Sequence, residues 1–340
     1  MKKKVTFQDI ADELGVSKGL VSIAINNKYG VSEAMRSKIV LKAIEKGYVF
    51  KNETKKSKTI SLLIKNIGVL NEEFWRQCIF GIEGECAKKN IVFNIINWAN
   101  INSVDDIMFK IFEEKNDGLI ILNQCKDSIA EKIGKLDIPI VCVDMINQFV
   151  SSADNVMANN FRAGEQAINY LLGKGHKKIV MIGNTEYSFS FLQRYFGCSK
   201  AIKIASKLDN EVESYAILDC EDNHLVDGIY QNDDSDLCNV SSLKEFLTNN
   251  DKYTAIVCFS DAILRQTIKI IPKNLSIVSI DNTSFSVEHD ITSVDIPKIE
   301  LGVLAVRTLI DRIENSRTTS LNMELNTKII ERNSVKEINV

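Results

Sequence analysis

The sequence predicts a small all-α head over residues 1–50, a linker or hinge over residues 51–59, and an α/β body over residues 60–340. Apolar residues of the head recur at i, i+3, i+4 and i+7, which is the spacing of one helix face. In the body, short runs rich in Ile and Val alternate with helical stretches about every 25–30 residues, as is typical of parallel sheets covered on both faces. We therefore expect the body to form two doubly wound parallel-sheet lobes.

The charge of the chain is divided unevenly between these parts. Residues 1–60 hold 13 Lys and Arg against 6 Asp and Glu, a charge of +7, while the remaining 280 residues hold 29 against 39, a charge of −10. A basic head on an acidic body predicts an anionic partner for the head alone, because the charge of the body repels phosphate backbones. A solvated basic face without any partner is the alternative.

Composition also limits the compartment and the chemistry. No apolar run approaches the roughly 18 residues that cross a bilayer, and polar residues such as Gln8 and Asp9 interrupt the basic start where a signal peptide would be apolar. The eight cysteines include no C-x-x-C pair and no zinc-ligand spacing, so reduced core thiols are expected. We expect a cytoplasmic protein with no membrane partner, no metal and no cofactor.

The head has the pattern of a helix-turn-helix unit. Thr6 can cap the first helix with Asp9 completing a capping box, and Gly15 ends that helix. Ser17 can cap the second helix, and a third ends near Gly47. The apolar faces of the three helices are Phe7, Ile10, Ala11 and Leu14, then Leu20, Val21, Ala24 and Ile25, then Met35, Ile39, Val40, Ala43 and Ile44. Two short helices joined by a tight turn, with a third to pack on, form this unit.

In a helix-turn-helix unit the N-terminal end of the second helix enters the major groove of DNA. Exposed residues there can bond base edges or phosphates, helix starts favour phosphate, and linker lysines add charge. The predicted DNA contacts are Thr6, Ser17, Lys18, Gly19, Ser22, Asn26, Ser32, Lys55 and Lys56, with Lys58 as a further linker lysine. Ser17 would cap its helix in either case, and Asn26 could serve only to end it.

The segment "VTFQDIADELGVSKGLVSIAINNKYGVSEAMRSKIVLKAIEKGYVF" resembles the DNA-binding head of the LacI/GalR family of bacterial transcription regulators. The resemblance continues in the body at "KGHKKIVMIG", "RYFGCSKAI", "LSIVSIDN", "DITSVDIPKIELG" and "LNTKIIERNSV". It implies a periplasmic-binding-protein-like body, a homodimer with two heads on adjacent half-sites of double-stranded operator DNA, and a small-molecule effector between the lobes. A sugar or related polar metabolite is the expected effector, and repression is the expected effect.

The sequence departs from the family pattern in the head and in the linker. Ile23 stands where the family has an arginine, and Leu20 replaces a threonine, so the operator sequence should differ from the common core of the family. The linker contains no leucine, the residue that the family inserts into the minor groove. Kinking of the operator by such a wedge is therefore not expected from this sequence.

In the body, the strand and helix predictions follow the apolar runs and the helical periodicity. The predicted strands are Ile60–Ile64, Ile91–Ile96, Gly118–Leu122, Pro139–Asp144, Lys178–Ile182, Tyr215–Leu218, Ala255–Phe259 and Leu275–Ile280. The predicted helices are Phe74–Lys89, Ser103–Glu114, Phe161–Leu172, Phe191–Lys207, Ser242–Asn249, Ala262–Ile271 and Lys298–Glu314.

Ligands of open parallel sheets bind beyond the C-terminal ends of the strands. Polar residues at these ends include Asn123, Asp144, Asp261 and Asp281, although strand ends are also polar simply because they reach the surface. The resemblance implies that Arg194 bonds the effector, that Asp261 and Asp281 are family acids, and that Phe74 supplies an aromatic face. The predicted effector contacts are Phe74, Asn123, Asp144, Arg194, Asp261 and Asp281. Asn159 and Asn160 replace the Asp-Asn pair of the family, so the pocket has diverged.

Catalysis has little support, so the chain is not expected to be an enzyme. The sequence has no phosphate loop, no dinucleotide fingerprint, no H-E-x-x-H and no nucleophile elbow. Each of His176, His224 and His289 is better explained as a buried or surface residue than as a catalytic base, and the candidate acids lack an evident partner. Two alternatives to an effector-controlled repressor stay open: a divergent regulator without an effector, and a sugar-binding module with no regulatory role.

Overall fold

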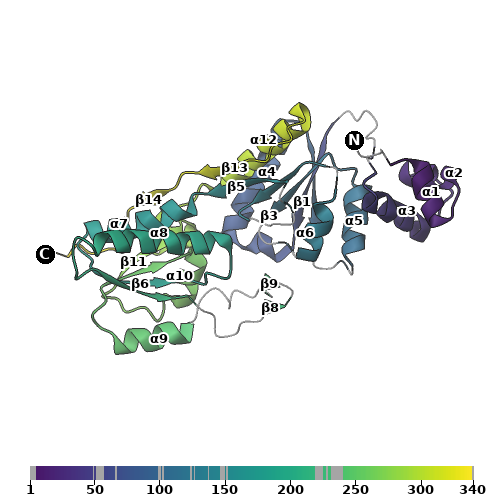
Figure 1. Cartoon of the computed structure of the whole chain (residues 1–340). Coiled ribbons are helices and arrows are strands. Elements are labelled where there is room, and N and C mark those ends of the chain that lie inside the picture. The colour runs from purple at the N-terminus through teal and green to yellow at the C-terminus, as the bar shows by residue number, and fades with distance from the viewer. Residues whose placement is uncertain are drawn as a thin grey trace.

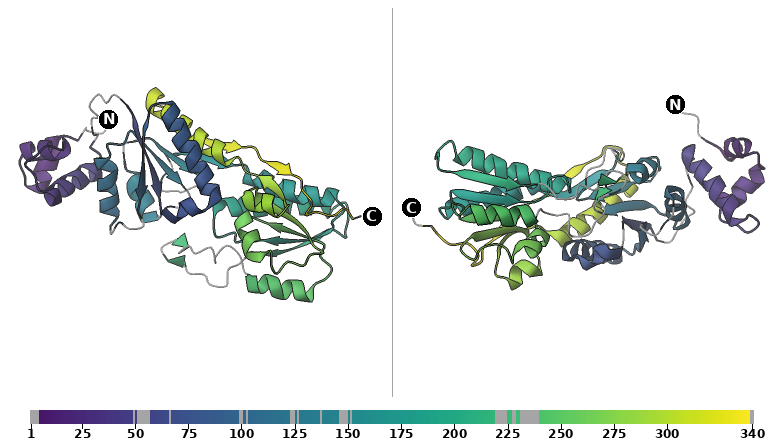
Figure 2. Two further views of the ribbon diagram at one scale, coloured as in Figure 1. Left: turned by 180° about the vertical axis from the view of Figure 1, so that it is seen from behind. Right: turned by 90° about the horizontal axis from the view of Figure 1, so that it is seen from below.

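The computed structural model describes residues 5–48, 50, 57–65, 67–98, 101, 103–122, 125, 127–136, 138–145, 150, 152–218, 225–226, 229–230 and 240–338. Three bodies follow one another along the molecule, as Figure 1 shows: a helical head at one end, a lobe beside it, and a second lobe at the far end. We call the lobe next to the head lobe 1 and the other lobe 2. Figure 2 shows the same order from behind and from below. No described helix is long and apolar enough to cross a membrane.

The head consists of α1 (Phe7–Leu14), α2 (Lys18–Ile25) and α3 (Glu33–Glu45). The predicted capping box is confirmed, because Thr6 and the N3 residue Asp9 bond each other's backbone. Gly15 adopts the left-handed conformation (φ 64°) that ends α1. The core of the head consists of Ile10, Ala11, Val21, Ala24, Ile39 and Ala43. These residues belong to the three predicted apolar stripes, so the periodicity alone located the core.

Lobe 1 is a six-stranded sheet in the order β13-β5-β4-β3-β1-β2. Its described strands all run parallel, and each sheet face is covered by helices. The strands are β1 (Thr59–Ile64), β2 (Val92–Asn97), β3 (Gly118–Leu122), β4 (Ile140–Val143), β5 (Asp154–Ala158) and β13 (Asn322–Leu325). The helices are η1 (Ile67–Asn71), α4 (Glu73–Lys88), α5 (Val104–Glu113), α6 (Asp127–Ile133) and α12 (Lys298–Asn315). Burial of both faces explains why these strands read as continuous apolar runs.

Lobe 2 repeats the plan with the strand order β14-β12-β11-β10-β6-β7, in which only β14 is antiparallel. The strands are β6 (Lys178–Ile182), β7 (Glu213–Ile217), β10 (Ala255–Cys258), β11 (Ser276–Asp281), β12 (Thr292–Asp295) and β14 (Lys328–Ile330). The helices are α7 (Asn160–Gly173), α8 (Phe189–Ala205), α9 (Val240–Asn249), α10 (Asp261–Thr267) and α11 (Ser284–Glu288). A separate hairpin joins β8 (Leu225–Val226) to β9 (Ile229–Tyr230).

Close packing of α7 on α8 fixes the position of the residues between the lobes. A Cβ atom on Gly164 would lie 2.1 Å from the carbonyl oxygen of Arg194, and one on Gly197 would lie 1.9 Å from the carbonyl oxygen of Phe161. Only glycine permits this approach of the two helix backbones. The contact therefore holds the helix that carries Arg194 against the start of α7.

The predicted fold class is confirmed, since a helical head precedes two parallel-rich sheets with helices on both faces. All eight predicted strands form, with ends shifted by one or two residues. The sequence analysis missed β5, β12, β13 and β14, together with the short helices α6 and α11. These elements carry few apolar residues in a row, because they lie at sheet edges or derive their burial from long-range pairing. The predicted linker lies largely outside the described residues.

Candidate functional site

The first candidate surface is the exposed side of α2 in the head. Ser17 caps the helix by accepting a hydrogen bond from the Leu20 amide at 3.1 Å. Lys18, Gly19 and Asn26 are exposed and Ser22 is half-buried. The Asn26 amide donates to the Ser22 hydroxyl at 3.3 Å, so these two predicted DNA contacts lie one helical turn apart on the same side of α2. Asn26 is also the C-cap that follows Ile25, the last residue of α2, as the alternative interpretation held.

Arg36 is a functional candidate that the sequence analysis missed. Its guanidinium donates to the carbonyl oxygen of Ala24 at 2.8 Å, to that of Lys28 at 2.6 Å and to that of Ile23 at 3.4 Å. The carbonyl groups at a helix C-terminus have no partner within the helix. Arg36 of α3 therefore caps the end of α2 and fixes its direction. A single arginine in a basic segment gives no sign of this role in the sequence.

The remaining predicted DNA contacts are placed as follows. Thr6 and Ser32 are the N-caps of α1 and α3, with side chains that accept from the amides of Asp9 and Met35. Lys55 and Lys56 lie outside the described residues. The Lys58 ammonium forms an ion pair of 2.7 Å with Glu314 of α12, so this lysine is directed to the body rather than available for phosphate.

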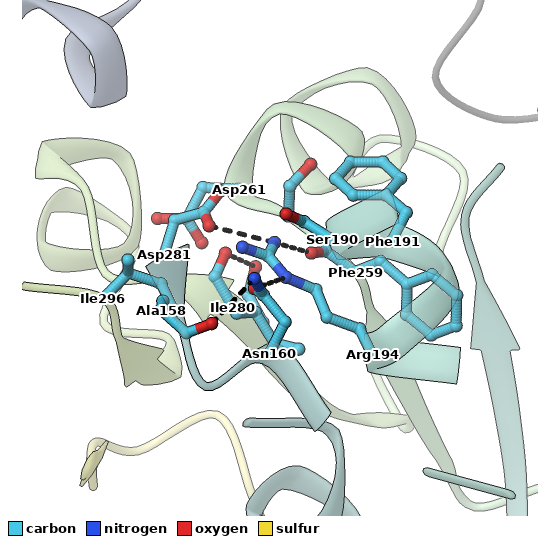
Figure 3. A network of polar contacts seen from close by, with 12 residues as sticks. Ala158, Asn160, Ser190, Phe191, Arg194, Phe259, Asp261, Ile280, Asp281 and Ile296 are labelled. Atoms are coloured by element: carbon cyan, nitrogen blue, oxygen red, sulfur yellow. Dashed lines mark hydrogen bonds and ion pairs between the residues drawn. The ribbon is translucent and has the colours of Figure 1, made fainter. Parts of the chain in front are cut away.

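The second candidate site lies between the lobes and centres on Arg194 of α8. Only 2% of this residue is exposed. Its guanidinium donates to Asn160 Oδ1 at 2.9 Å and to the carbonyl oxygen of Phe259, and it pairs with Asp281 Oδ1 at 3.0 Å. Figure 3 shows the guanidinium directed between Asn160 and the acids Asp261 and Asp281. The predicted residues Arg194, Asp261 and Asp281 are thus brought together, although they are far apart in the sequence.

Asp261 is occupied by its own lobe. One carboxylate oxygen accepts from the Thr283 amide at 2.6 Å and from the Thr283 hydroxyl at 2.7 Å, and the other accepts from the Ser286 hydroxyl at 2.6 Å. These bonds hold the loop after β11 and the start of α11. Asp261 therefore shapes the wall of the site through this loop.

Polar contacts of Asp144, Glu73 and Lys298 in lobe 1 join the lobes directly, and the Lys298 ammonium at the start of α12 donates to the carbonyl oxygen of Asp281 in lobe 2. The Ser190 hydroxyl of α8 donates to Asp144 Oδ1 at 2.6 Å, and Asp144 follows β4 of lobe 1. Glu73, at the start of α4 in lobe 1, accepts from the Ser284 amide at 3.0 Å and from the Ser284 hydroxyl at 2.5 Å. Ser284 begins α11 in lobe 2. These contacts hold the two lobes against each other.

Burial controls the acidity of the carboxyl groups in this site. It raises the pKa of Asp281 to about 6, although the positive charge of Arg194 acts in the opposite direction. Burial also raises the pKa of Asp144, against the hydrogen bond from Ser190. Both residues have positive φ angles, 111° at Asp281 and 55° at Asp144. Such angles are uncommon outside glycine and are often found at functional sites.

The described residues here suit hydrogen bonding better than catalysis or metal binding. The site combines carboxylates, an amide and a guanidinium, and Lys298 adds a buried ammonium that donates to the carbonyl oxygens of Asp281 and Ile296. No group of three or more His, Cys, Asp or Glu among the described residues could hold a metal ion. The His176 ring bonds the Thr254 hydroxyl and the Lys336 carbonyl oxygen in lobe 2, which is a structural role.

The other predicted effector residues are less informative. Phe74 is half-buried at the start of α4, next to Glu73, and its ring meets Trp75 edge-on at 4.7 Å. Asn123 follows β3 but lies outside the described residues. Asn160 was not among the predicted contacts, although the sequence analysis assigned the Asn159-Asn160 pair to the diverged pocket, and its amide oxygen accepts a hydrogen bond from Arg194. Asn160 matches the second position of the family's Asp-Asn pair, so the departure from the family lies at Asn159.

Comparison with known proteins identifies both parts of the chain. Residues 6–49 match the lacI family of bacterial regulatory proteins, and residues 168–335 match a periplasmic binding protein-like domain. The HTH-type transcriptional repressor PurR of Vibrio vulnificus is 25% identical over 352 residues, covering 98% of this chain and 99% of that protein.

Solved structures share the fold over nearly the whole chain. A complex of the transcriptional regulator CelR with cellobiose has a TM-score of 0.66 at 20% identity, covering 97% of this chain and 100% of that one. The lac repressor dimer bound to operator and an anti-inducer has a TM-score of 0.63 at 18% identity, covering 98% of this chain and 100% of that one. With a helix-turn-helix head and a periplasmic-binding-protein-like body, the chain belongs to the LacI family of bacterial regulatory proteins.

Proposed function

We propose that the chain is a transcriptional repressor that binds operator DNA as a homodimer. The observation that carries this proposal is the exposed polar side of α2, with Lys18, Gly19, Ser22 and Asn26, at the basic end of the chain, where residues 1–60 carry a charge of +7. Residues 1–50 form the DNA-binding head in this proposal, residues 51–59 the linker, and residues 60–340 the effector-binding and dimerisation core. The lac repressor and PurR are repressors by name, which supports the same sign of regulation here.

Exposed apolar side chains along the two outer sheet edges support the homodimer. In lobe 1 they lie on α4 and on the edge strand β2, and in lobe 2 on α8, on the segment after it, and on the edge strand β7. The residues are Phe80, Val92 and Ile95 in lobe 1, and Phe196, Ile204, Leu208 and Tyr215 in lobe 2. Apolar patches of this kind mark interfaces. Replacing Phe80 by Glu should convert the dimer to a monomer in sedimentation experiments.

A small polar molecule is the proposed effector, bound between the lobes near Asp144, Arg194, Asp281 and Asp261. Carboxylate, amide and guanidinium groups suit a ligand rich in hydroxyl groups, such as a sugar. The cellobiose complex of CelR supports this class. Phe74, at the start of α4, and Asn123, which follows β3 in the sequence, are further candidates. The family is one of transcription regulators, which favours ligand binding over turnover by this site.

A regulator without a small-molecule effector is the second candidate, and one observation favours it. Arg194 already has Asn160, Phe259 and Asp281 as partners of its Nε and Nη1 atoms, so this buried guanidinium is partly bonded within the protein before any ligand binds. A thermal-unfolding screen of the full chain with monosaccharides and disaccharides separates the two. A shift with one sugar supports the effector, while no shift with any sugar supports the second candidate.

Operator binding is tested with a DNA duplex that the full chain selects from a random pool. Replacement of Lys18 or Ser22 by Ala should weaken binding by about 1–3 kcal/mol, because each removes a contact to base edges. Lys38→Ala is the matched control, since Lys38 is an exposed lysine on α3 outside the side of α2. If no duplex is selected at low salt, or if both α2 variants bind as the wild type does, the proposal is wrong.

A further inference from the structure

The head is packed directly on lobe 1. Helix α3 contacts α5, and the side chains of Leu41 and Ile44 pack against the apolar cluster that contains Ile107, Met108 and Ile111 of α5. Leu41 and Ile44 are therefore only partly exposed, although they lie on the outer side of the head's own core. Figure 1 shows α5 beside the head, with α3 between α5 and the remaining two helices of the head.

A row of aromatic rings crosses this contact. Phe7 of α1 lies 5.2 Å from Tyr48, Tyr48 lies 5.2 Å from Phe50, and Phe50 lies 4.9 Å from Phe112 of α5, measured between ring centroids. Phe109 extends the row by one turn of α5, 6.4 Å from Phe112. Aromatic pairs at such separations are stabilising beyond the area that they bury. The row thus connects the first helix of the head to lobe 1 by side chains rather than through the linker.

The contact leaves the DNA-facing side of the head exposed. Lys18, Gly19 and Asn26 of α2 remain exposed while α3 is packed on α5. Helix α5 also begins beyond the end of β2 and ends before the start of β3, so it extends along lobe 1 from the C-terminal ends of the parallel strands to their N-terminal ends. The head is therefore held by lobe 1 in one orientation, with its polar helix directed to solvent.

We propose that the α3–α5 contact orients the head for operator binding, and that Phe50 and Phe112 are positioning residues that do not touch DNA. A dimer binds its operator more tightly when both heads are already oriented toward their half-sites. An oriented head loses less rotational and translational entropy when it binds DNA. The linker sequence, which lacks the leucine wedge of the family, leaves this orienting task to other contacts. The inference rests on the proposed DNA binding and adds the residues that direct it.

The test compares Phe112→Ala and Phe50→Ala with the wild-type full chain. Binding to the selected palindromic duplex should weaken roughly two- to tenfold in each variant, as expected for loss of one aromatic pair. Binding to a duplex with a single half-site should stay unchanged, because the DNA contacts of one head remain intact. The double variant should bind no more weakly than the weaker single variant, since both remove the same contact.

Lys110→Ala is the control on the same helix, because Lys110 is exposed on α5 and lies outside the aromatic row. Circular dichroism of each variant checks that the head is folded. Unchanged binding of the palindrome by both Phe variants would overturn the inference, and so would tighter binding, which would mean that the packed head is held away from DNA. Failure of the wild-type chain to select any duplex would instead contradict the proposed function.

Discussion

The head and the site between the lobes use polar groups in opposite ways. On α2 the predicted contact residues are mostly exposed, and the hydrogen-bond partners of Ser17 and Asn26 lie three and four residues away in the sequence. Between the lobes, Arg194 and Asp281 are buried and bonded to each other. The head can meet a large anion such as DNA without rearrangement. A ligand between the lobes would meet groups that already bond each other, so its binding is coupled to their geometry.

Removal of Arg194 should show the largest effect, because the site between the lobes depends on it for stability. Arg194→Ala leaves the buried Asp281 carboxylate without its partner, which is expected to reduce the free energy of unfolding by about 3–5 kcal/mol. Urea denaturation at pH 7.5 measures the change. Arg162→Ala is the control, since this exposed arginine on α7 should contribute less than about 0.5 kcal/mol. Equal effects of the two substitutions would contradict the buried pairing.

The pH dependence of the free energy of unfolding should report the titration of Asp281 in the same site. Because burial raises the pKa of Asp281 from 3.8 to about 6, the folded state binds its proton more tightly than the unfolded state does. The contribution of Asp281 to stability is complete below about pH 4 and is lost as pH rises through about 6, with a slope of up to about 1.4 kcal/mol per pH unit.

The direction of this pH dependence is checked by measuring the free energy of unfolding of Asp281→Asn and of the wild type between pH 4 and 7, and by subtracting the first curve from the second. The difference should fall as pH rises, because only the wild type loses a proton from this position. Asp144, whose pKa burial also raises, is present in both proteins and cancels. A difference that rises with pH would mean that the ion pair with Arg194 outweighs burial.

The two regions also differ in how well the sequence predicts them. In the head, the caps Thr6 and Ser17 and the three apolar stripes depend on contacts within one or two helical turns, and the helical periodicity located them. In the body, the predicted strands formed because buried parallel strands are continuous apolar runs. Short elements such as β12 and β13 were missed, because their burial comes from partners far along the chain.

Site residues follow the same rule. The resemblance placed Arg194, Asp261 and Asp281 in one site, and the structure brings them together. The sequence analysis did not find Asn160 or Glu73, since their partners Arg194 and Ser284 are 34 and 211 residues away. Spacing in the sequence carries no information on contacts of this range. Arg36 was missed for a different reason, because a basic residue in a basic head gives no sign that it bonds carbonyl groups.

Arg36→Met tests whether α2 depends on the cap that Arg36 of α3 supplies at its C-terminal end. Loss of the bonds to Ala24 and Lys28 should raise the free energy of α2 by about 1–2 kcal/mol and loosen its last turn. Hydrogen exchange at the amides of Asn26 and Lys28 measures this loosening. Lys38→Met, on the exposed side of α3, is the matched control. Equal exchange in both variants would mean that α2 is held by its core contacts alone.

Glu73→Ala should give the smallest effect, and it tests whether closure of the lobes depends on direct contacts between them. The carboxylate of Glu73 accepts from the amide and the hydroxyl of Ser284 at a partly exposed position, so its loss should cost about 1 kcal/mol. The ratio of closed to open lobes should then fall roughly fivefold, which spin labels on the two lobes measure as a longer distance. Glu83→Ala, at an exposed position of the same helix, should leave that distance unchanged. If Glu73→Ala also leaves it unchanged, the less exposed contacts of Asp144 with Ser190 and of Lys298 with Asp281 are sufficient for closure, and exposed groups matter only in the head.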